Sequence, residues 1–209
     1  MTKPPRYHGG AYEAGPLSRL ISTYLHASKD SSNADYKFVK DNIDAVLKHF
    51  GASDITPLQS TLGRTAGRNV ETLYVAKKEV EWIEELIAVI KSGDVDLFEE
   101  PKQTSGEGSG MWEAPRGALY HYEKIENDQI AKYQIIIPST WNIGPRDEKG
   151  TPGPMEQALK GVPVNDVEMP INALRTVHSF DPCVACAIHV SEPSTGKHFE
   201  TVLNPWGVR

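Results

Sequence analysis

The residues with the most distinctive chemistry lie near the end of the 209-residue chain, in the stretch F-D-P-C-V-A-C-A-I-H. It holds both cysteines of the protein, Cys183 and Cys186, with Asp181 before them and His189 after them. Closely spaced thiolates bind soft metal ions, and two thiols can also cycle as a redox pair. A disulfide between them would close too small a loop to stabilise a chain of this length. The pair is therefore interpreted as metal ligands, as a redox dithiol or as cysteines without a chemical role.

Two self-contained forms of this chemistry fit the sequence poorly. A closed zinc site needs four ligands, and His189 is the only further candidate nearby. A thioredoxin-type C-x-x-C follows an early strand of a βαβ unit, whereas Cys183 and Cys186 lie towards the far end of the chain. The residues around the cysteines are more informative than the cysteines alone.

The cysteine stretch resembles the carboxy-terminal signature D-P-C-x-x-C-x-x-H of the nickel–iron hydrogenase large subunit. Other motifs of that family occur in the family's order and cover nearly the whole chain. They are P-R-Y at 5–7 with E-x-G-P-L-x-R at 13–19, S-T-L-G-R-T-A-x-R at 60–68, E-A-P-R-G at 113–117 and P-S-T-W-N-x-x-P-R-D at 138–147. The chain lacks the family's R-x-C-G-x-C motif, which supplies the other two nickel-binding cysteines, and its E-G-H segment. It therefore resembles the carboxy-terminal part of a large subunit.

The resemblance implies specific metal ligands. Cys183 would be a terminal nickel ligand, and Cys186 would bridge nickel and iron. His189 and the backbone carbonyl of Ile135 would bind a magnesium ion, with a glutamate from the missing part as the third protein ligand. Iron–sulfur clusters would lie only in a partner subunit, because both cysteines of this chain are already used.

The resemblance also implies which residues surround the iron, which carries carbon monoxide and cyanide in this family. Arg116 would donate to one cyanide and act as a base in the splitting of hydrogen. Pro115 and Asp181 would lie beside it, and the Asp181 carboxylate could orient the guanidinium through a charge-assisted pair. Ser139 would donate to the second cyanide. The wall around the carbon monoxide would be formed by Leu119, Ile137 and Pro138. Ordinary core packing would give these three residues the same contacts without the ligand.

The implied activity is H2 ⇌ 2 H⁺ + 2 e⁻, carried out with a small subunit that holds iron–sulfur clusters and with a chain that carries R-x-C-G-x-C. Residues 1–189 would form the carboxy-terminal part of the large-subunit domain. Residues 190–209 would be an extension that a maturation endopeptidase removes by cutting between His189 and Val190. The implied location is periplasmic or membrane-associated through the partner, and otherwise cytoplasmic. The alternatives are a non-catalytic fragment or maturation intermediate, and a free-standing metal-binding or thiol-redox module.

Composition narrows the function classes. The net charge of −6 argues against a nucleic-acid partner, because affinity for phosphates comes from clustered Lys and Arg. No apolar run approaches the roughly 20 residues that a membrane-spanning helix needs. With 39% apolar and 24% charged residues, the composition is that of a globular domain.

The pattern of apolar and turn residues predicts the elements that position these side chains. It indicates an α+β, predominantly helical fold, with one long bundle helix and a small β-hairpin region. A helix is expected over about 34–50, and a second, of about 36 residues, from Thr56-Pro57 to Gly93. The length of the second suggests a bundle whose other helices lie on another chain. Its Gly63 and Gly67 indicate either close backbone approach or two tolerated helix glycines. The remaining expectations are irregular chain at 1–30, a loop at 101–112, a hairpin of 118–125 and 129–137 with Ile135–Ile137 buried on both faces, a loop at 144–163, and a short segment at 169–178.

Overall fold

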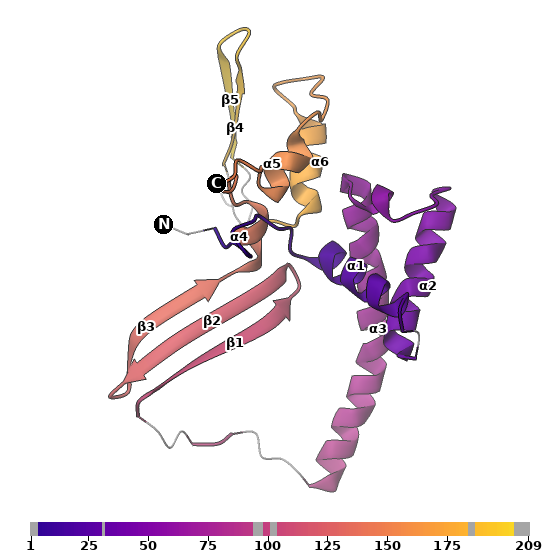
Figure 1. The fold of residues 1–209 in the computed structure, drawn as a ribbon, viewed down its shortest axis with the longest axis vertical. Helices are drawn as coiled ribbons and strands as arrows, with labels where there is room; N and C mark the ends of the chain where they lie inside the picture. The colour runs from indigo at the N-terminus through magenta and orange to yellow at the C-terminus, as the bar shows by residue number, and fades with distance from the viewer. Residues whose placement is uncertain (1–3, 31, 94–97, 101–103, 184–186, 203–209) are drawn as a thin grey trace. The chain divides into compact units, whose positions relative to one another are not determined.

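The computed structural model of the protein describes residues 4–30, 32–93, 98–100, 104–183 and 187–202, and Figure 1 shows its trace. The chain divides into two compact units. We call Gly15–Ile137 the middle unit, and Met1–Ala14 together with Pro138–Arg209 the terminal unit. The α+β, predominantly helical class predicted from the sequence is confirmed.

Three helices build the core of the middle unit: α1 (Pro16–Ala27), α2 (Ala34–His49) and α3 (Thr61–Ser92). Their apolar faces meet in one cluster, to which the short 3-10 helix η1 (Thr56–Leu58) also contributes. The buried members are Leu17, Leu20, Val39, Ile43, Leu47, Leu58 and Val70. Full burial of such a side chain contributes about 1.5–3 kcal/mol each, so this cluster holds the three helices together.

Helix α1 lies in the region predicted to be irregular, so that prediction is wrong between Pro16 and Ala27. Gly15, with φ of 134°, precedes the helix, and Pro16 occupies its first turn, where a missing N–H has no cost. Leu17 and Leu20 then fall on one face and are both buried. The Gly-Pro pair marks the start of a helix here, not the continuation of a loop.

Helix α2 confirms the helix predicted over residues 34–50. The Asn33 side chain caps its start by accepting hydrogen bonds from the amides of Asp35 and Tyr36. After it, Gly51 has φ of 65°, and its N–H donates to the carbonyl of Lys48. Glycine suits this left-handed position because it has no Cβ to clash with the backbone.

Helix α3 confirms the predicted long helix, but its start is displaced. Thr56-Pro57 begins η1, and the N-cap of α3 is Ser60, whose hydroxyl accepts from the amide of Gly63 at 3.0 Å. The end of this 3-10 turn packs closely against α3, since a β-carbon at Gly63 would lie only 2.2 Å from the Leu58 carbonyl oxygen. Gly63 therefore serves close backbone approach, while Gly67 has only ordinary contacts, the nearest at 3.5 Å. The helix ends as predicted at Gly93, with φ of 84°.

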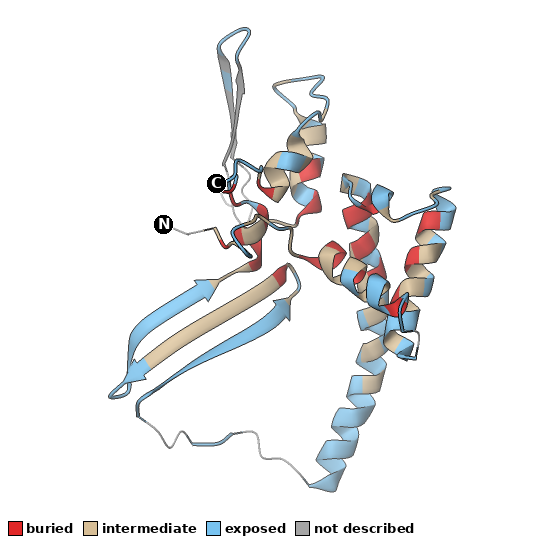
Figure 2. Cartoon of the chain, viewed as in Figure 1, coloured by how far each residue is buried: buried red, intermediate tan, exposed pale blue. Residues whose placement is uncertain are grey.

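The second half of α3 carries its apolar residues on the surface, as Figure 2 shows in pale blue. The exposed apolar residues of this half are Val80, Trp82, Ile83, Leu86, Ile87, Val89 and Ile90. A continuous exposed apolar surface of this kind is unusual for a protein that works as a monomer. In the described part of the chain, no helix has the combination of length and apolarity that a bilayer crossing requires.

A three-stranded antiparallel sheet completes the middle unit, in the order β1 (Gly106–Ala114), β2 (Gly117–Glu126) and β3 (Gln129–Ile136). The predicted hairpin is confirmed as β2–β3, whereas the predicted loop at 101–112 is wrong from Gly106 onward, because β1 pairs with β2 along its whole length. The expectation that Ile135–Ile137 is buried on both faces is also wrong. Ile135 is exposed, and Ile136 and Ile137 are only half-buried.

The terminal unit consists of short elements. They are α4 (Pro138–Asn142), α5 (Pro154–Leu159), α6 (Ile171–Ser179) and the hairpin of β4 (Ala187–Glu192) and β5 (Lys197–Val202). Helix α5 corrects the loop predicted over 144–163, with a proline in its first turn and Glu156 bonded back to the amide of Gly153. Helix α6 confirms the short segment predicted before the cysteines.

Candidate metal-binding site

The turn that carries Arg116 joins β1 to β2 in the middle unit. Ala114 pairs with Gly117, so Pro115 and Arg116 form a two-residue turn between the strands. Gly117 is buried and has φ of 131°, which a residue with a side chain rarely adopts. Pro115 is exposed and Arg116 is half-buried. The backbone of this turn is thus set by residue types that allow little alternative geometry.

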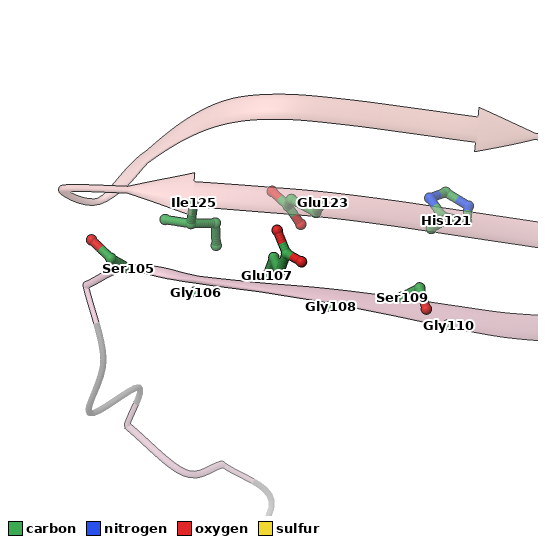
Figure 3. Close-up of a pocket in the computed structure, with 9 residues that line it drawn as sticks. All are labelled: Ser105, Gly106, Glu107, Gly108, Ser109, Gly110, His121, Glu123 and Ile125. Carbon is green, nitrogen blue, oxygen red and sulfur yellow. The ribbon is translucent and has the colours of Figure 1, made fainter.

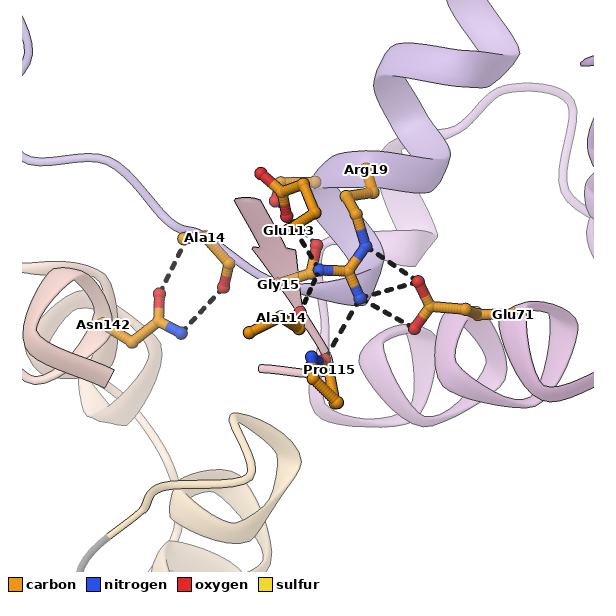
Figure 4. Close-up of polar contacts among 9 residues, drawn as sticks. Ala14, Gly15, Arg19, Glu71, Glu113, Ala114, Pro115 and Asn142 are labelled. Carbon is orange, nitrogen blue, oxygen red and sulfur yellow. Dashed lines mark hydrogen bonds and ion pairs between the residues drawn. The ribbon is translucent and has the colours of Figure 1, made fainter. Parts of the chain in front are cut away.

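Arg19 of α1 extends its guanidinium against this turn (Figure 4). It donates to the carbonyl oxygens of Ala114 at 2.8 Å and Pro115 at 3.1 Å, and to the Glu113 carboxylate at 2.8 Å. On its other side, Nε and Nη2 form a bidentate pair with Glu71 of α3, at 2.8 and 2.9 Å. One side chain therefore links α1, α3 and the Arg116 turn.

The other predicted residues of the middle unit lie along the sheet. Leu119 is half-buried on β2 opposite Trp112. Ile135 lies opposite His121, and its carbonyl accepts from the Gln134 side chain at 3.2 Å. Ile137 is half-buried and follows β3 directly.

In the terminal unit, the structure brings two of the predicted motifs together. Ser139, in α4, is almost fully buried, with 4% of its surface exposed, and follows the buried Pro138. Its hydroxyl oxygen accepts a hydrogen bond from the backbone amide of Cys183 at 3.0 Å. The P-S-T-W-N motif and the first cysteine are therefore in direct contact, although 44 residues separate them.

Backbone contacts hold α4 in place. The Asn142 side chain makes two hydrogen bonds to Ala14, one from its amide nitrogen to the carbonyl and one to its oxygen from the N–H, at 2.8 and 2.9 Å. Arg6 donates to the carbonyl of Pro145 at 2.8 Å. The P-R-Y motif at 5–7 thus contacts the P-R-D end of the fourth motif, so the two ends of the terminal unit position each other.

Asp147 closes the loop after α4. Its carboxylate accepts from the amides of Thr151 and Lys149, both at 2.9 Å, and only 8% of the residue is exposed. These hydrogen bonds, that from Thr151 foremost, hold the pKa of Asp147 below its ordinary value because they stabilise the charged form.

Asp181 and Cys183 follow α6 in an unusual backbone. Phe180, with only 5% of its surface exposed, anchors the end of the helix. Asp181 then has φ of 50°, the left-handed region, and its N–H donates to the carbonyl of His178 at 2.9 Å. Cys183 is exposed, and its thiol is not in a disulfide. The turn thus presents this cysteine at the surface of the unit.

The remaining predicted ligands are described in part or not at all. Cys186 lies outside the described residues. His189 lies in β4, where its backbone pairs with Glu200 of β5. Among the residues that the structure describes, no group of three or more His, Cys, Asp or Glu side chains is placed to hold a metal ion. Within this chain, the described donors therefore do not complete a metal site.

A groove of about 430 Å³ runs along β1 and β2 (Figure 3). Its polar lining includes Glu107, His121 and Glu123, and none of the predicted site residues line it. The groove gives no support to a second metal site, because its acidic side chains do not form a ligating group.

The sequence marks Arg19 only as the last residue of the E-x-G-P-L-x-R motif, and it does not mark Glu71 as a functional residue. The motif gave a signal for Arg19, since its arginine occurs at a fixed place after Gly-Pro-Leu. Glu71 has no such signal, because it is one of several charged residues along α3.

The fold and these motifs are those of the nickel-dependent hydrogenase family. Residues 1–189 match the family model described as nickel-dependent hydrogenase, so the chain belongs to this family. The family predicted from the motifs is thereby confirmed.

Individual relatives agree. The uptake hydrogenase large subunit of Bradyrhizobium diazoefficiens is 40% identical over 91% of this chain and 32% of its own length. The quinone-reactive Ni/Fe-hydrogenase large chain of Wolinella succinogenes is 36% identical over 91% of this chain and 32% of its own length. The Ni-Fe-Se hydrogenase of D. vulgaris Hildenborough in the reduced state superposes with a TM-score of 0.66 and 34% identity, over 86% of this chain and 36% of that chain. The chain spans about a third of the length of the curated relatives it matches.

Proposed function

We propose that this chain is the carboxy-terminal part of the large subunit of a nickel–iron hydrogenase that catalyses H2 ⇌ 2 H⁺ + 2 e⁻. The family match and the order of the motifs support this. The observation that carries the proposal is the hydrogen bond from the Cys183 amide to the Ser139 hydroxyl. It joins a predicted metal ligand to a predicted donor of the iron site within one unit, as a shared site requires.

The donor set suits half of a nickel–iron centre. Cys183 would be a terminal nickel ligand and Cys186 the bridge to iron, since soft thiolates suit these metals and can be shared between two of them. When bound, the centre supplies the site at which hydrogen is split heterolytically. The two other thiolates would come from a segment that carries R-x-C-G-x-C, because this sequence contains only two cysteines.

The remaining residues would act around that centre. Arg116 would donate to one cyanide and take up the proton, with Pro115 beside it and Asp181 orienting its guanidinium. Ser139 would donate to the second cyanide. The apolar wall that keeps water from the carbon monoxide would consist of Leu119, Ile137 and Pro138. His189 and the Ile135 carbonyl would bind magnesium together with a glutamate of the companion chain.

Two features of the described residues support a companion chain. The indole N–H of Trp141, in the S-T-W-N motif, is buried and has no acceptor in the described part of the chain, and buried donors in native proteins are almost always paired. The apolar residues of the second half of α3 are exposed. Electrons would leave through iron–sulfur clusters of a small subunit, and that partner would set a periplasmic or membrane-associated location.

We further propose that Val190–Arg209 is an extension removed by an endopeptidase that cuts between His189 and Val190. The family match ends at His189, which supports this boundary. Both residues lie in β4, with His189 paired to Glu200 and Val190 to Phe199. Proteases bind their substrates as single extended strands, so the hairpin would have to open before the cut.

Metal analysis of the complex purified from its native source tests the proposal. We expect nickel together with an excess of iron, because the iron–sulfur clusters of the small subunit add to the iron of the nickel–iron centre, and hydrogen oxidation with an artificial electron acceptor. Cys183→Ser should abolish nickel binding, whereas His198→Gln, which lies in the proposed extension, should leave the metal content unchanged. A complex without nickel, or a Cys183→Ser variant that retains nickel, would overturn it.

A non-catalytic fragment or maturation intermediate is the second candidate, favoured by the chain's coverage of about a third of its relatives. Copurification separates the two. If no chain bearing R-x-C-G-x-C accompanies the protein and neither metal is found, the fragment is the better description.

A further inference from the structure

The guanidinium of Arg19 has a full set of hydrogen bonds. Arginine carries five N–H donors in a planar fork. Here Nε donates to Glu71, one Nη to Glu71 and the Pro115 carbonyl, and the other Nη to Glu113 and the Ala114 carbonyl. The Arg19 side chain is only 20% exposed. Such complete use of the fork fixes the side chain in one orientation, beyond what a single surface ion pair achieves.

We propose that Arg19 is a positioning residue for Arg116: held by Glu71, it clamps the carbonyls of Ala114 and Pro115 and so fixes the backbone from which the Arg116 side chain extends. This inference rests on the function proposed for Arg116. In this proposal, Arg19 itself contacts neither the substrate nor a metal ligand.

The turn gains from contacts outside its own two strands. Pro115 has no N–H, β1 is an edge strand, and the β1 residues next to the turn are exposed or half-buried. The carbonyls of Ala114 and Pro115 belong to the two peptide groups that directly precede Arg116. For a catalytic group, a displacement of about 1 Å can cost about 100-fold in rate.

Gly15 contacts the same turn from the start of α1. A β-carbon on Gly15 would lie 3.3 Å from the carbonyl oxygen of Arg116, and the φ of 134° suits glycine alone. The E-x-G-P-L-x-R motif therefore contacts the E-A-P-R-G motif twice, through the backbone of Gly15 and the side chain of Arg19. Both contacts reach the backbone of Ala114–Arg116, and Arg19 also bonds the Glu113 carboxylate.

Glu71 determines which way the fork points. Its carboxylate is 24% exposed and bidentate, whereas the Glu113 side chain is 52% exposed. The better-buried pair is the stronger one, so Glu71 carries most of the orientation. Lysine at position 19 would keep the charge opposite Glu71 but lose the planar fork that also reaches both carbonyls.

A purely structural ion pair between α1 and α3 is the alternative, and Lys78 is its matched control. Lys78 lies on the same helix α3, its side chain is 18% exposed, and it pairs with two carboxylates, Asp35 at 2.9 Å and Glu81 at 2.7 Å. It has no bond to the Arg116 turn. Lys78→Gln should therefore loosen the helices without affecting the turn.

The first test is amide hydrogen exchange on the 209-residue chain, which needs no metal. We expect Arg19→Lys and Glu71→Ala to speed amide exchange at residues 113–118 by at least about tenfold. Each variant loses hydrogen bonds to a charged donor that stabilise the closed form of the turn, so the turn opens more often. Lys78→Gln should leave exchange there as in the wild type. Equal exchange in Arg19→Lys and wild type, or equal acceleration in Lys78→Gln, would overturn the proposal.

The second test uses the assembled complex, and its readout is the infrared stretching bands of the iron-bound cyanides. Arg19→Lys should shift or broaden one cyanide band and lower kcat by about 10- to 100-fold with KM unchanged, while Lys78→Gln should do neither. A wild-type complex that lacks the bands would refute the proposed function and leave the exchange result standing. Wild-type bands that are unaltered in Arg19→Lys would refute the clamp alone.

Discussion

A single methyl group at Gly63 should destabilise the protein, although alanine is the better helix former. The new β-carbon would lie 2.2 Å from the Leu58 carbonyl oxygen and 2.4 Å from its Cα, against the 3.4 Å at which ordinary contact begins. The atoms it meets are backbone, which cannot rotate away. Leu58 would have to move by more than an ångström, and it is part of the buried cluster of α1, α2 and α3.

The expected magnitude follows from two opposing terms. Replacing glycine by alanine inside a helix gains about 1 kcal/mol, and overpacking costs about 1–3 kcal/mol, with a backbone clash at the upper end. Gly63→Ala should therefore lose about 2 kcal/mol of the free energy of unfolding. Gly67→Ala, one turn further along α3, meets only ordinary contacts, the nearest at 3.5 Å, and should gain up to about 1 kcal/mol.

Urea unfolding followed by far-UV circular dichroism measures both variants under the same conditions. The comparison of the two variants is informative because both replace glycine by alanine in the same helix, so the change in helix propensity is the same in both. The two variants should differ by about 3 kcal/mol, the sum of the two opposite effects. If Gly63→Ala is as stable as the wild type, or more stable than Gly67→Ala, the close approach of α3 to Leu58 is refuted.

Three further outcomes are expected. Ser139→Ala should cost about 1 kcal/mol of stability in urea unfolding, since the Cys183 amide loses its acceptor, and a Ser139→Thr variant that loses as much would contradict the role of the hydroxyl. Because its folded pKa is lowered, Asp147 contributes stability above its unfolded pKa of about 4, which is lost as the pH falls through the folded pKa. Asp147→Asn should thus make the free energy of unfolding fall less steeply as the pH is lowered below about 4. An unchanged fall would contradict the role of the Asp147 carboxylate. Gly196→Val, at φ of 69° in the β4–β5 turn, should strain the hairpin by about 1–2 kcal/mol and speed exchange and endopeptidase cleavage near Val190. Gly161→Val, at φ of 77°, is the matched control, and equal tail exchange in the two variants would refute the pairing.

The local elements were predictable where the sequence carries a repeating signal. The apolar spacing of α2 and the cap at Asn33 are local features, as are the spacing of α3 and its end at Gly93. The β2–β3 hairpin was likewise marked by its alternating strands around Glu126-Asn127-Asp128. Strand β1 was missed because its glycines and serine are typical of a loop, and only pairing with β2 makes it a strand.

The sequence alone determined the family and the candidate chemistry, because the motifs can be recognised from residue types and their spacing without knowing which residues are in contact. It placed Cys183, Arg116 and Ser139 in a single proposed site on that ground. Only the tertiary structure decided that the Ser139 hydroxyl bonds the Cys183 amide and that Arg19 joins Glu71 to the turn before Arg116. Those contacts span many residues of chain, and the packing that brings them together leaves no periodic mark in the residues between.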